Sequence, residues 1–453
     1  MSHRRVVQRW AMATLALLLV AGGCSETGGT ATTTSAEPTA TTLADGALAP
    51  MDGDGSVVSR YAGAEWTLGT VPTTATAADD TLAPIKIGFM NTDSGPIAAT
   101  PELHEATDAA VAFINTELGG VDGHPIEIVP CEVDLSPEKA QTCARTLVSE
   151  GVVAVLNGLG LASDAAVKIL EENNIAWVGG IPLNEGEMRS PIAFQFSGGS
   201  PGAFVAFAQH VGEVQGAKKA AVMYVNTPQV SIAAEQYGVK LLEALGVDVT
   251  PVPFDLGTQD YAAVVSKAID SNPEAILVGA ADFACPKVMQ ALVDIGTDAT
   301  VYMVGSCADR KWLDQVGIDN VVGTVFNVEG RLDAKASTDA DTEIYADVIE
   351  KYAPDTNARG AATVAFRSTM NLYSVLSEIG AAATPQQIID TFRAAKDRPS
   401  YDGHAYTCDG KQVPGLPSLC AAQGVLGRLD GPDQFSEVSD GWIDVPAIVA
   451  KYL

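Results

Sequence analysis

From residue 85 onward the sequence alternates between short runs rich in β-branched residues and longer helical stretches, and this alternation limits the possible folds most strongly. The first strand-like runs are IKIGFM (85–90), HPIEIVPCEVD (124–134), VVAVLNG (152–158) and IAWVGG (175–180). A helical stretch separates each from the next. Such alternation predicts βαβ units with a parallel sheet.

The alternation stops at FQFSGGSPG (194–202) and then resumes as far as TVYMVGS (300–306). Two parallel α/β sheets in tandem imply two similar lobes, so we predict an α/β protein with two doubly wound lobes. After about residue 331 come further helical stretches and then a Gly- and Pro-rich C-terminal stretch.

The N-terminus has the pattern of an exported lipoprotein. A basic stretch, MSHRRVVQR, precedes WAMATLALLLVAGG, an apolar stretch too short to span a bilayer comfortably. It ends in Ala-Gly-Gly-Cys, which resembles a bacterial lipobox and predicts a signal peptide at residues 1–24 with lipidation of Cys24. The alternative is ordinary signal cleavage that leaves Cys24 free. No other run of 18 or more apolar residues occurs.

Residues 25–84 are rich in Thr, Ala, Gly and Asp, a composition that predicts a flexible tether. The part around Tyr61, Trp66 and Leu68 is more apolar. It either docks on the folded body or stays disordered.

Six cysteines remain after Cys24, and they fall into three pairs that are close in sequence. We predict the disulfides Cys131–Cys143, Cys285–Cys307 and Cys408–Cys420 in an oxidising compartment, although six cysteines permit fifteen pairings. No CxxC occurs and no His lies at ligand spacing from a cysteine pair, so a zinc site is not expected. The net charge of −29, without a basic stripe, argues against nucleic-acid binding.

Two motifs suggest enzymes at first sight, and both fail on physical grounds. GLGLAS (158–163) lacks the third glycine of a dinucleotide fingerprint, and no acid stands at the tip of the next strand. Its backbone N–H groups could still hold a small carboxylate or amide, or the loop could be a plain turn. GGSPG (198–202) fits a nucleophile elbow, but Pro201 has no N–H to donate to an oxyanion. Ser200 is more simply a helix N-cap. We therefore predict no catalytic residues, no cofactor and no metal.

The glycines in FINTELGGVDGHPIEIVPCEVD (113–134) follow a helix and precede a strand, which is the reverse of a phosphate-binding loop. With the following helix, this stretch resembles the extracytoplasmic solute-binding proteins of the branched-chain amino acid (Leu/Ile/Val-binding) type. The residues that carry the resemblance are Asn115, Gly119, Gly120, Val121, Gly123, Asp134 and Pro137, with further matches at Ser94 to Pro96 and at Asp260 and Tyr261. The resemblance covers about residues 85–444.

The resemblance implies a type I periplasmic binding fold whose lobes are joined by a three-strand hinge. Lobe 1 would comprise 85–200 and 331–400, and lobe 2 would comprise 201–330 and 401–453. Crossings are expected near 197–203, 327–332 and 400–405, with hinge closure on a ligand.

The resemblance also implies a monomer that captures a small solute and delivers it to an ABC transporter permease, outside the cytoplasm and anchored to the membrane by a lipid. The alternatives are a ligand-sensing lipoprotein of the same fold, or an enzyme on a doubly wound fold.

In open parallel sheets, ligands bind beyond the carboxyl ends of the strands, and we expect the ligand site there. The predicted ligand-binding residues are Ser94, Leu159, Gly160, Leu161, Ser163, Gly180, Ile181, Pro182, Asn226, Gln229, Asp282, Phe283 and Ser306. Asp282 could equally be only solvent-exposed.

The hydroxyl groups with which the family holds an amino acid are largely missing from these loops. Several of the loop residues are apolar, which favours an amino acid, an amide or a related, partly apolar solute. The cleft loops carry no Lys or Arg, which argues against a polyanionic ligand.

Overall fold

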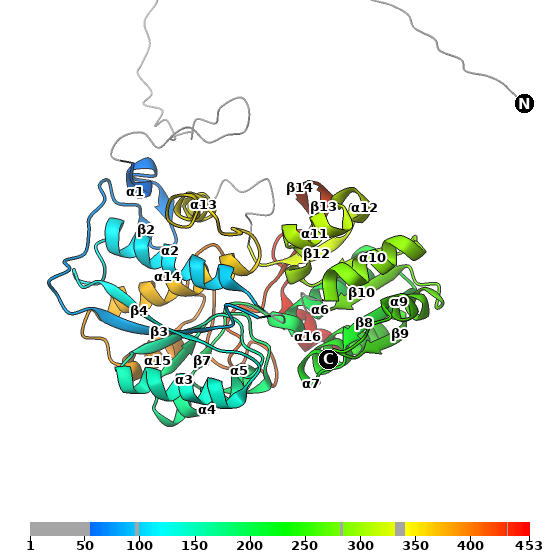
Figure 1. Cartoon of the computed structure of the whole chain (residues 1–453), viewed down its shortest axis with the longest axis horizontal. Coiled ribbons are helices and arrows are strands. Elements are labelled where there is room, and N and C mark those ends of the chain that lie inside the picture. Colours follow the sequence, from blue (N-terminus) through cyan, green and yellow to red (C-terminus); the bar gives the residue numbers. More distant parts are fainter. Residues whose placement is uncertain (1–54, 96–98, 281–283, 331–339, 433) are drawn as a thin grey trace, which may run out of the picture. The chain divides into compact units, whose positions relative to one another are not determined.

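The computed structural model describes residues 55–95, 99–280, 284–330, 340–432 and 434–453 (Figure 1). The predicted signal peptide, Cys24 and the first part of the predicted tether lie outside the described residues, as do Asp282 and Phe283.

The first lobe is built on a parallel five-stranded sheet in the order β4-β3-β5-β6-β7. Its strands are β3 (Ile85–Asn91), β4 (Ile126–Glu132), β5 (Ala154–Asn157), β6 (Ala176–Val178) and β7 (Ala193–Phe194). The middle strands are buried along their whole length, as expected for a sheet covered on both faces. The predicted strands and the parallel sheet are confirmed.

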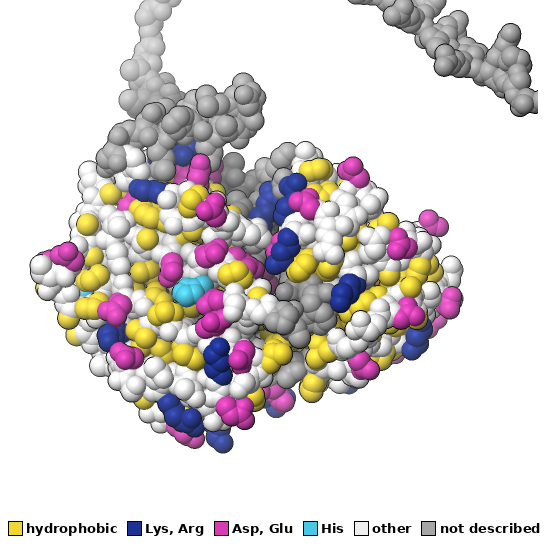
Figure 2. All heavy atoms as spheres, in the orientation of Figure 1, with side chains coloured by type: hydrophobic (Ala, Val, Ile, Leu, Met, Phe, Trp, Pro, Cys, Tyr) yellow, Lys and Arg dark blue, Asp and Glu magenta, His cyan; other side chains and the backbone are white. Residues whose placement is uncertain are grey.

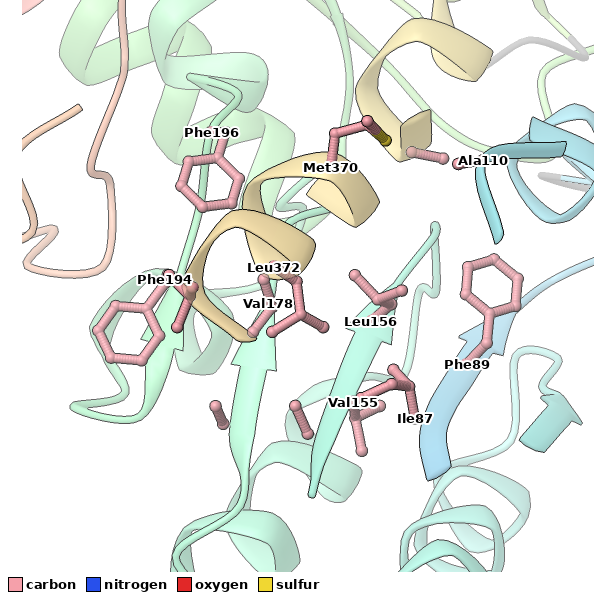
Figure 3. Packing of buried hydrophobic residues seen from close by; sticks show 14 of the residues in the cluster. Ile87, Phe89, Ala110, Val155, Leu156, Val178, Phe194, Phe196, Met370 and Leu372 are labelled. Atoms are coloured by element: carbon pink, nitrogen blue, oxygen red, sulfur yellow. The ribbon is translucent and has the colours of Figure 1, made fainter. Parts of the chain in front are cut away.

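Helices cover both faces of this sheet. They are α2 (Pro101–Glu117), α3 (Pro137–Glu150), α4 (Asp164–Glu172), α5 (Glu185–Arg189), α13 (Ala340–Tyr352), α14 (Ala361–Ile379) and α15 (Pro385–Ala394). Helix α14 packs against α2, and α3 packs against α4. Figure 3 shows Leu372 of α14 lying close to Val178 of the sheet, while Met370 of the same helix points towards Ala110 of α2.

The second lobe has a seven-stranded sheet in the order β14-β13-β12-β11-β10-β8-β9. Five strands are parallel: β8 (Lys219–Val225), β9 (Asp248–Phe254), β10 (Ala275–Gly279), β11 (Thr300–Met303) and β12 (Val325–Val328). The C-terminal stretch adds two antiparallel strands at one edge, β13 (Val425–Gly431) and β14 (Gln434–Glu437). These two strands were not predicted, because the glycines of β13 and the proline that follows it resemble a loop.

The helices of this lobe are α6 (Gly199–Gln209), α7 (Pro228–Ile232), α8 (Lys240–Ala244), α9 (Tyr261–Ile269), α10 (Cys285–Ile295), α11 (Arg310–Val316), α12 (Ile318–Val321) and α16 (Val445–Tyr452). Helix α6 continues as a π-helical stretch, His210–Val214, and another, Ala233–Val239, joins α7 to α8. A 3₁₀ turn, Gly305–Ala308, follows β11. Separate hydrophobic clusters fill the two sides of this sheet.

The chain leaves the first lobe between β7 and α6 and leaves the second lobe after β12, near the first two predicted crossings. The third crossing differs from the predicted one at 400–405. Tyr401 and Tyr406 are fully buried in the core of the first lobe, together with Cys408. Leu426 packs in the second lobe. Two large buried aromatic rings thus keep the chain in the first lobe past Cys408, so the chain crosses later than predicted.

Residues 55–84, which we call the N-terminal cap, fold onto the first lobe instead of continuing the tether. The cap contains α1 (Val57–Arg60) and a hairpin of β1 (Glu65–Trp66) and β2 (Gly69–Thr70). Val57, Val58 and Val71 are almost fully buried in the core of the first lobe. Trp66 packs edge-on against Phe113 of α2 and also against Tyr401. The predicted tether is therefore too long: a few apolar anchors are enough to dock a segment of otherwise bland composition.

Polar contacts also hold the cap. The N–H of Val58 donates to the carboxylate of Glu117 at 2.9 Å. The hydroxyl of Tyr61 donates to Asp347 at 2.8 Å, and Arg60 forms an ion pair with the same carboxylate at 3.0 Å. Partners on both α2 and α13 join the cap to two helices that are distant in sequence.

All three predicted disulfides are confirmed. Cys131–Cys143 joins β4 to α3, Cys285–Cys307 joins the start of α10 to the turn after β11, and Cys408–Cys420 closes a loop of the C-terminal segment. In the part of the chain that the structure describes, no helix is both long enough and apolar enough to cross a membrane.

Candidate functional site

A cleft of about 210 Å³ lies between the two lobes, beyond the carboxyl ends of strands from both sheets. Figure 2 shows the groove between the lobes on one face, with Lys and Arg side chains along it. From the first lobe the lining residues are Ala99, Thr100, Glu102, Leu159, Leu161, Ile181, Leu183, Asn357, Arg359, Gly360 and Ala361. From the second lobe they are Gly199, Ser200, Ala203, Val225, Thr227, Val230, Leu256, Gly279, Ala280, Val304, Gly305, Ser306, Ala308, Asp309, Lys311, Trp312, Asn327, Val328, Glu329 and Phe435.

The loop after β5 presents two of the predicted leucines to the cleft. Asn91 at the end of β3 accepts the N–H of Leu159 through Oδ1 at 2.9 Å, which fixes the start of the loop. Leu159 and Leu161 line the cleft, whereas Ser163 does not. The hydroxyl of Ser163 donates to the carbonyl of Gly160 at 2.8 Å, and the side chain is buried inside the turn. The serine therefore holds the loop in shape.

The loop after β6 presents Ile181 to the cleft, while Gly180 and Pro182 are not among its lining residues. Gly180 has a φ of +80°, and a Cβ on it would lie 2.5 Å from the side chain of Asn157. Its N–H donates to the hydroxyl of Ser368 on α14 at 3.3 Å. The glycine thus permits close packing between the strand end and α14.

Glu187, a buried carboxylate that was not predicted as a site residue, holds these two loops together through hydrogen bonds. Oε2 of Glu187 accepts the N–H groups of Leu183 and Asn184, each at 2.9 Å. Oε1 accepts Nδ2 of Asn157 at 3.2 Å, and Nδ2 of Asn184 donates to the carbonyl of Gly160 at 2.8 Å. Burial raises the pKa of Glu187 to about 7 despite these donors. The spacing Asn-x-x-Glu is a capping-box signal and could have identified this residue.

The second lobe contributes mainly apolar side chains and one of its predicted polar groups, Ser306. Asn226 is exposed, with Nδ2 donating to Asp255 at 3.3 Å, and it is not a lining residue. Gln229 lies on α7, but its side chain is outside the described part of the chain. Ser94, in the first lobe, is also exposed, and its hydroxyl donates to Glu132 away from the cleft. The structure thus brings together Leu159, Leu161, Ile181 and Ser306.

The cleft also carries cations, Lys311 and Arg359, which weakens the argument against a polyanionic ligand that was drawn from loops without Lys or Arg. Lys311 on α11 forms an ion pair with Asp309 at 3.2 Å and lies 4.7 Å over the ring of Trp312. Arg359, from the segment before α14, lies 5.8 Å over the ring of Phe435 in the other lobe. Lys311 lies just beyond the loop that follows β11, and Arg359 comes from the distant segment before α14.

At the base of the cleft, the crossing segments are held together by hydrogen bonds. The hydroxyl of Ser197 in the first crossing donates to Oε1 of Glu329 in the second at 3.0 Å. Arg367 of α14 is 2% exposed, and its guanidinium donates to the main-chain carbonyl groups of Glu329 and, at 2.8 Å, Asp402. One buried cation thereby joins the second crossing to the segment beyond residue 400. In the described ranges, no group of three or more His, Cys, Asp or Glu side chains could hold a metal ion.

Comparison with known proteins agrees with this architecture. The family model described as periplasmic binding protein matches residues 84–414. No curated protein matches the sequence. A leucine-binding protein from Thermotoga maritima has 17% identity and a TM-score of 0.66, over 78% of this chain and 98% of that one. A fatty acid ABC transporter substrate-binding protein from Thermomonospora curvata has 14% identity and a TM-score of 0.69, over 82% and 96%.

A solute-binding protein of an ABC transporter from R. palustris, solved with 4-hydroxybenzoate, has 20% identity and a TM-score of 0.67, over 80% of this chain and 97% of that one. At these identities the likeness shows the fold, and the predicted type I periplasmic binding fold is confirmed. Together with the family model, which spans most of the sequence, it establishes that the chain belongs to the periplasmic binding protein family.

Proposed function

We propose that this protein is the solute-binding component of an ABC transporter, and that it captures a small, partly apolar solute in the cleft between its lobes. The observation that carries the proposal is the composition of the cleft. Leu159, Leu161 and Ile181 project from one lobe, and Val225 and Val304 face the cleft from the other. Apolar walls with a few polar groups are typical of small-molecule sites.

The construction of the cleft supports a binding mechanism based on closure. Its two walls belong to separate sheets, and they are joined at the base by the crossing segments that contain Ser197 and Glu329. A solute that contacts both walls buries more apolar surface in the closed form than in the open form, so it favours closure. Covalent chemistry has no part in this function.

The solute class is an amino acid, an amide or a related compound with an apolar body. The similar solved structures include proteins named for leucine and for fatty acids, and one solved with 4-hydroxybenzoate. These compounds share an apolar body with a polar head, which is the chemistry that the cleft walls favour.

The test is a thermal-shift screen of the purified protein over amino acids, amides, aromatic acids and fatty acids. A solute that binds only the native state raises the unfolding midpoint in a concentration-dependent way. Leu161→Asp places a charge in the apolar wall, where Leu161 is 37% exposed, so the fold should tolerate it while binding weakens about tenfold or more. Leu135→Asp is the matched control, because Leu135 is 50% exposed on another loop of the same lobe and does not line the cleft. Absence of any midpoint shift, or equal shifts in both variants, would refute the proposal.

We further propose that the protein lies outside the cytoplasm, is anchored by lipidated Cys24, acts as a monomer and delivers its solute to a permease. Three disulfides support an oxidising compartment. Mass spectrometry of the protein from its native membrane tests the anchor: a diacylglyceryl mass on Cys24 is expected, and its loss in Cys24→Ala should release the protein from the membrane. An unmodified Cys24 in the native protein would contradict it.

A further inference from the structure

Glu329 is a cleft-lining carboxylate with one oxygen that no described protein group hydrogen-bonds. It follows β12, lines the cleft, and belongs to the second crossing. Its Oε1 accepts the hydroxyl of Ser197. Among the described residues, Oε2 has no hydrogen-bond partner and the carboxylate forms no ion pair. Glu329 is half-buried in the cleft wall, so Oε2 can accept a further hydrogen bond from a solute in the cleft.

The neighbouring cation does not neutralise Glu329 by direct contact. The guanidinium of Arg367 donates to two main-chain carbonyl groups, Asp402 O and Glu329 O. It therefore holds the backbone of the crossing and leaves the side-chain oxygen available. Burial raises the pKa of the Glu329 carboxyl, and the positive charge of Arg367 opposes that rise.

The other polar groups at the base of the cleft are already engaged or neutral. Oδ1 of Asn327 accepts the N–H of Gly305 at 2.8 Å and so holds the turn that carries Ser306. The cations Lys311 and Arg359 interact with the rings of Trp312 and Phe435. The Glu329 carboxylate can only accept hydrogen bonds when ionised, and its Oε2 is not hydrogen-bonded by a described residue.

Resting on the proposed function, we propose that Glu329 is the polar anchor for the solute, and that the solute joins an apolar body to a hydrogen-bond donor, an amine or amide N–H, at its head. The head donates to Oε2 of Glu329 while the body lies between the leucines of one lobe and the valines of the other. Solutes whose polar group is only an acceptor, such as a carboxylate, would face the carboxylate of Glu329 and be rejected.

The alternative is that Glu329 serves only to join the first two crossings through Ser197. Glu329→Gln separates these roles, because the amide oxygen still accepts the hydroxyl of Ser197 while the amide nitrogen replaces Oε2 with a donor. Ser197→Ala is the complementary variant, since it removes the bond between the crossings and keeps the carboxylate.

The experiment measures the affinity of the full-length protein for three probes that share one branched apolar body: 3-methylbutylamine, 4-methylpentanamide and 4-methylpentanoate. The wild type should bind the amine and the amide at least about tenfold more tightly than the carboxylate, since hydrogen bonds to charged groups are among the stronger ones. Glu329→Gln should lose about tenfold for the amine and gain for the carboxylate. Ser197→Ala should keep the wild-type order of preference.

Equal or tighter binding of the carboxylate by the wild type would overturn the inference, and so would an unchanged order of preference in Glu329→Gln. In either case, loss of probe binding in Leu161→Asp would leave the cleft as the binding site, so that the proposed function stands alone. If only a different solute of the wider screen binds, Glu329→Gln must weaken it about tenfold, and unchanged binding would overturn the inference. If no compound binds at all, the proposed function and the inference fall together.

Discussion

Glu187 offers a direct test of how the cleft wall is held, because ionising this buried carboxyl should lower the free energy of unfolding by a predictable amount. The carboxyl is fully buried beneath the two loops of the first-lobe wall, and burial raises its pKa from an ordinary value of 4.5 to about 7. The folded state therefore binds a proton more readily than the unfolded state between these two pH values. It follows that the stability contributed by the protonated form is present below pH 4.5 and is lost as the pH rises through about 7.

The size of this effect follows from the pKa. At about 1.4 kcal/mol per pH unit, the rise corresponds to a loss of about 3 kcal/mol in the free energy of unfolding at pH 8.5. Glu187→Gln removes the charge and keeps an oxygen for the N–H groups of Leu183 and Asn184. Oδ1 of Asn157 has no hydrogen-bond partner among the described residues. If the side-chain amide of Asn157 flips, the new NH₂ group in Glu187→Gln can donate to this oxygen.

The assay is urea unfolding of the wild type and Glu187→Gln at a series of pH values from 5 to 8.5. The two proteins should have similar stability near pH 5, and the variant should be more stable by about 3 kcal/mol at pH 8.5. All other titrating groups are common to both proteins, so their contributions cancel in the difference. A difference that does not change with pH would refute the reasoning about burial. A variant that is less stable at every pH would show that the hydrogen bonds to the carboxylate outweigh the cost of its desolvation.

Three further changes test other parts of the structure. Val58→Asp places a charge in the buried interface of the N-terminal cap and should lower the free energy of unfolding in urea by about 3 kcal/mol or more. Thr73→Asp, on the exposed part of the cap, should be nearly neutral. Equal effects would show that the cap does not stabilise the lobe. Arg367→Ala leaves the carbonyl groups of Glu329 and Asp402 without their donor and should cost about 3 kcal/mol, with a smaller loss in Arg367→Lys. A neutral result would contradict the role of Arg367 at the crossings. Replacing both Cys285 and Cys307 by Ala opens a loop of 22 residues and should lower the free energy of unfolding by about 3 kcal/mol. The double variant should also show a smaller effect of dithiothreitol on the thermal midpoint. An unchanged stability would contradict the stabilising role of this disulfide.

The sequence was informative wherever a structural requirement is local. Buried parallel strands need runs of β-branched residues, so runs such as IKIGFM and IAWVGG predicted strands that the structure contains. The disulfides were also predicted correctly, because each joins two cysteines that are close in sequence, with separations of 12, 22 and 12 residues. The order of helices and strands was therefore sufficient to predict two α/β lobes.

What the sequence could not reveal depends on segments that meet only in the folded chain. Glu187 contacts Asn157, which is 30 residues away in the sequence, and so joins two separate loops. Arg359 reaches the cleft from the segment before α14, far from the loops that form the walls. The cap was hidden because Val57 and Val58 stand in a bland segment, and their burial depends on helices hundreds of residues further along the chain.

The central claim is that one small solute occupies the cleft between the lobes. Native mass spectrometry tests it most directly, with the solute that gives the largest thermal shift and with the wild type, Leu161→Asp and Leu135→Asp side by side. The account predicts one solute per chain in the wild type and in Leu135→Asp, and none at the same concentration in Leu161→Asp. Equal occupancy in all three proteins would place the solute elsewhere and contradict the account.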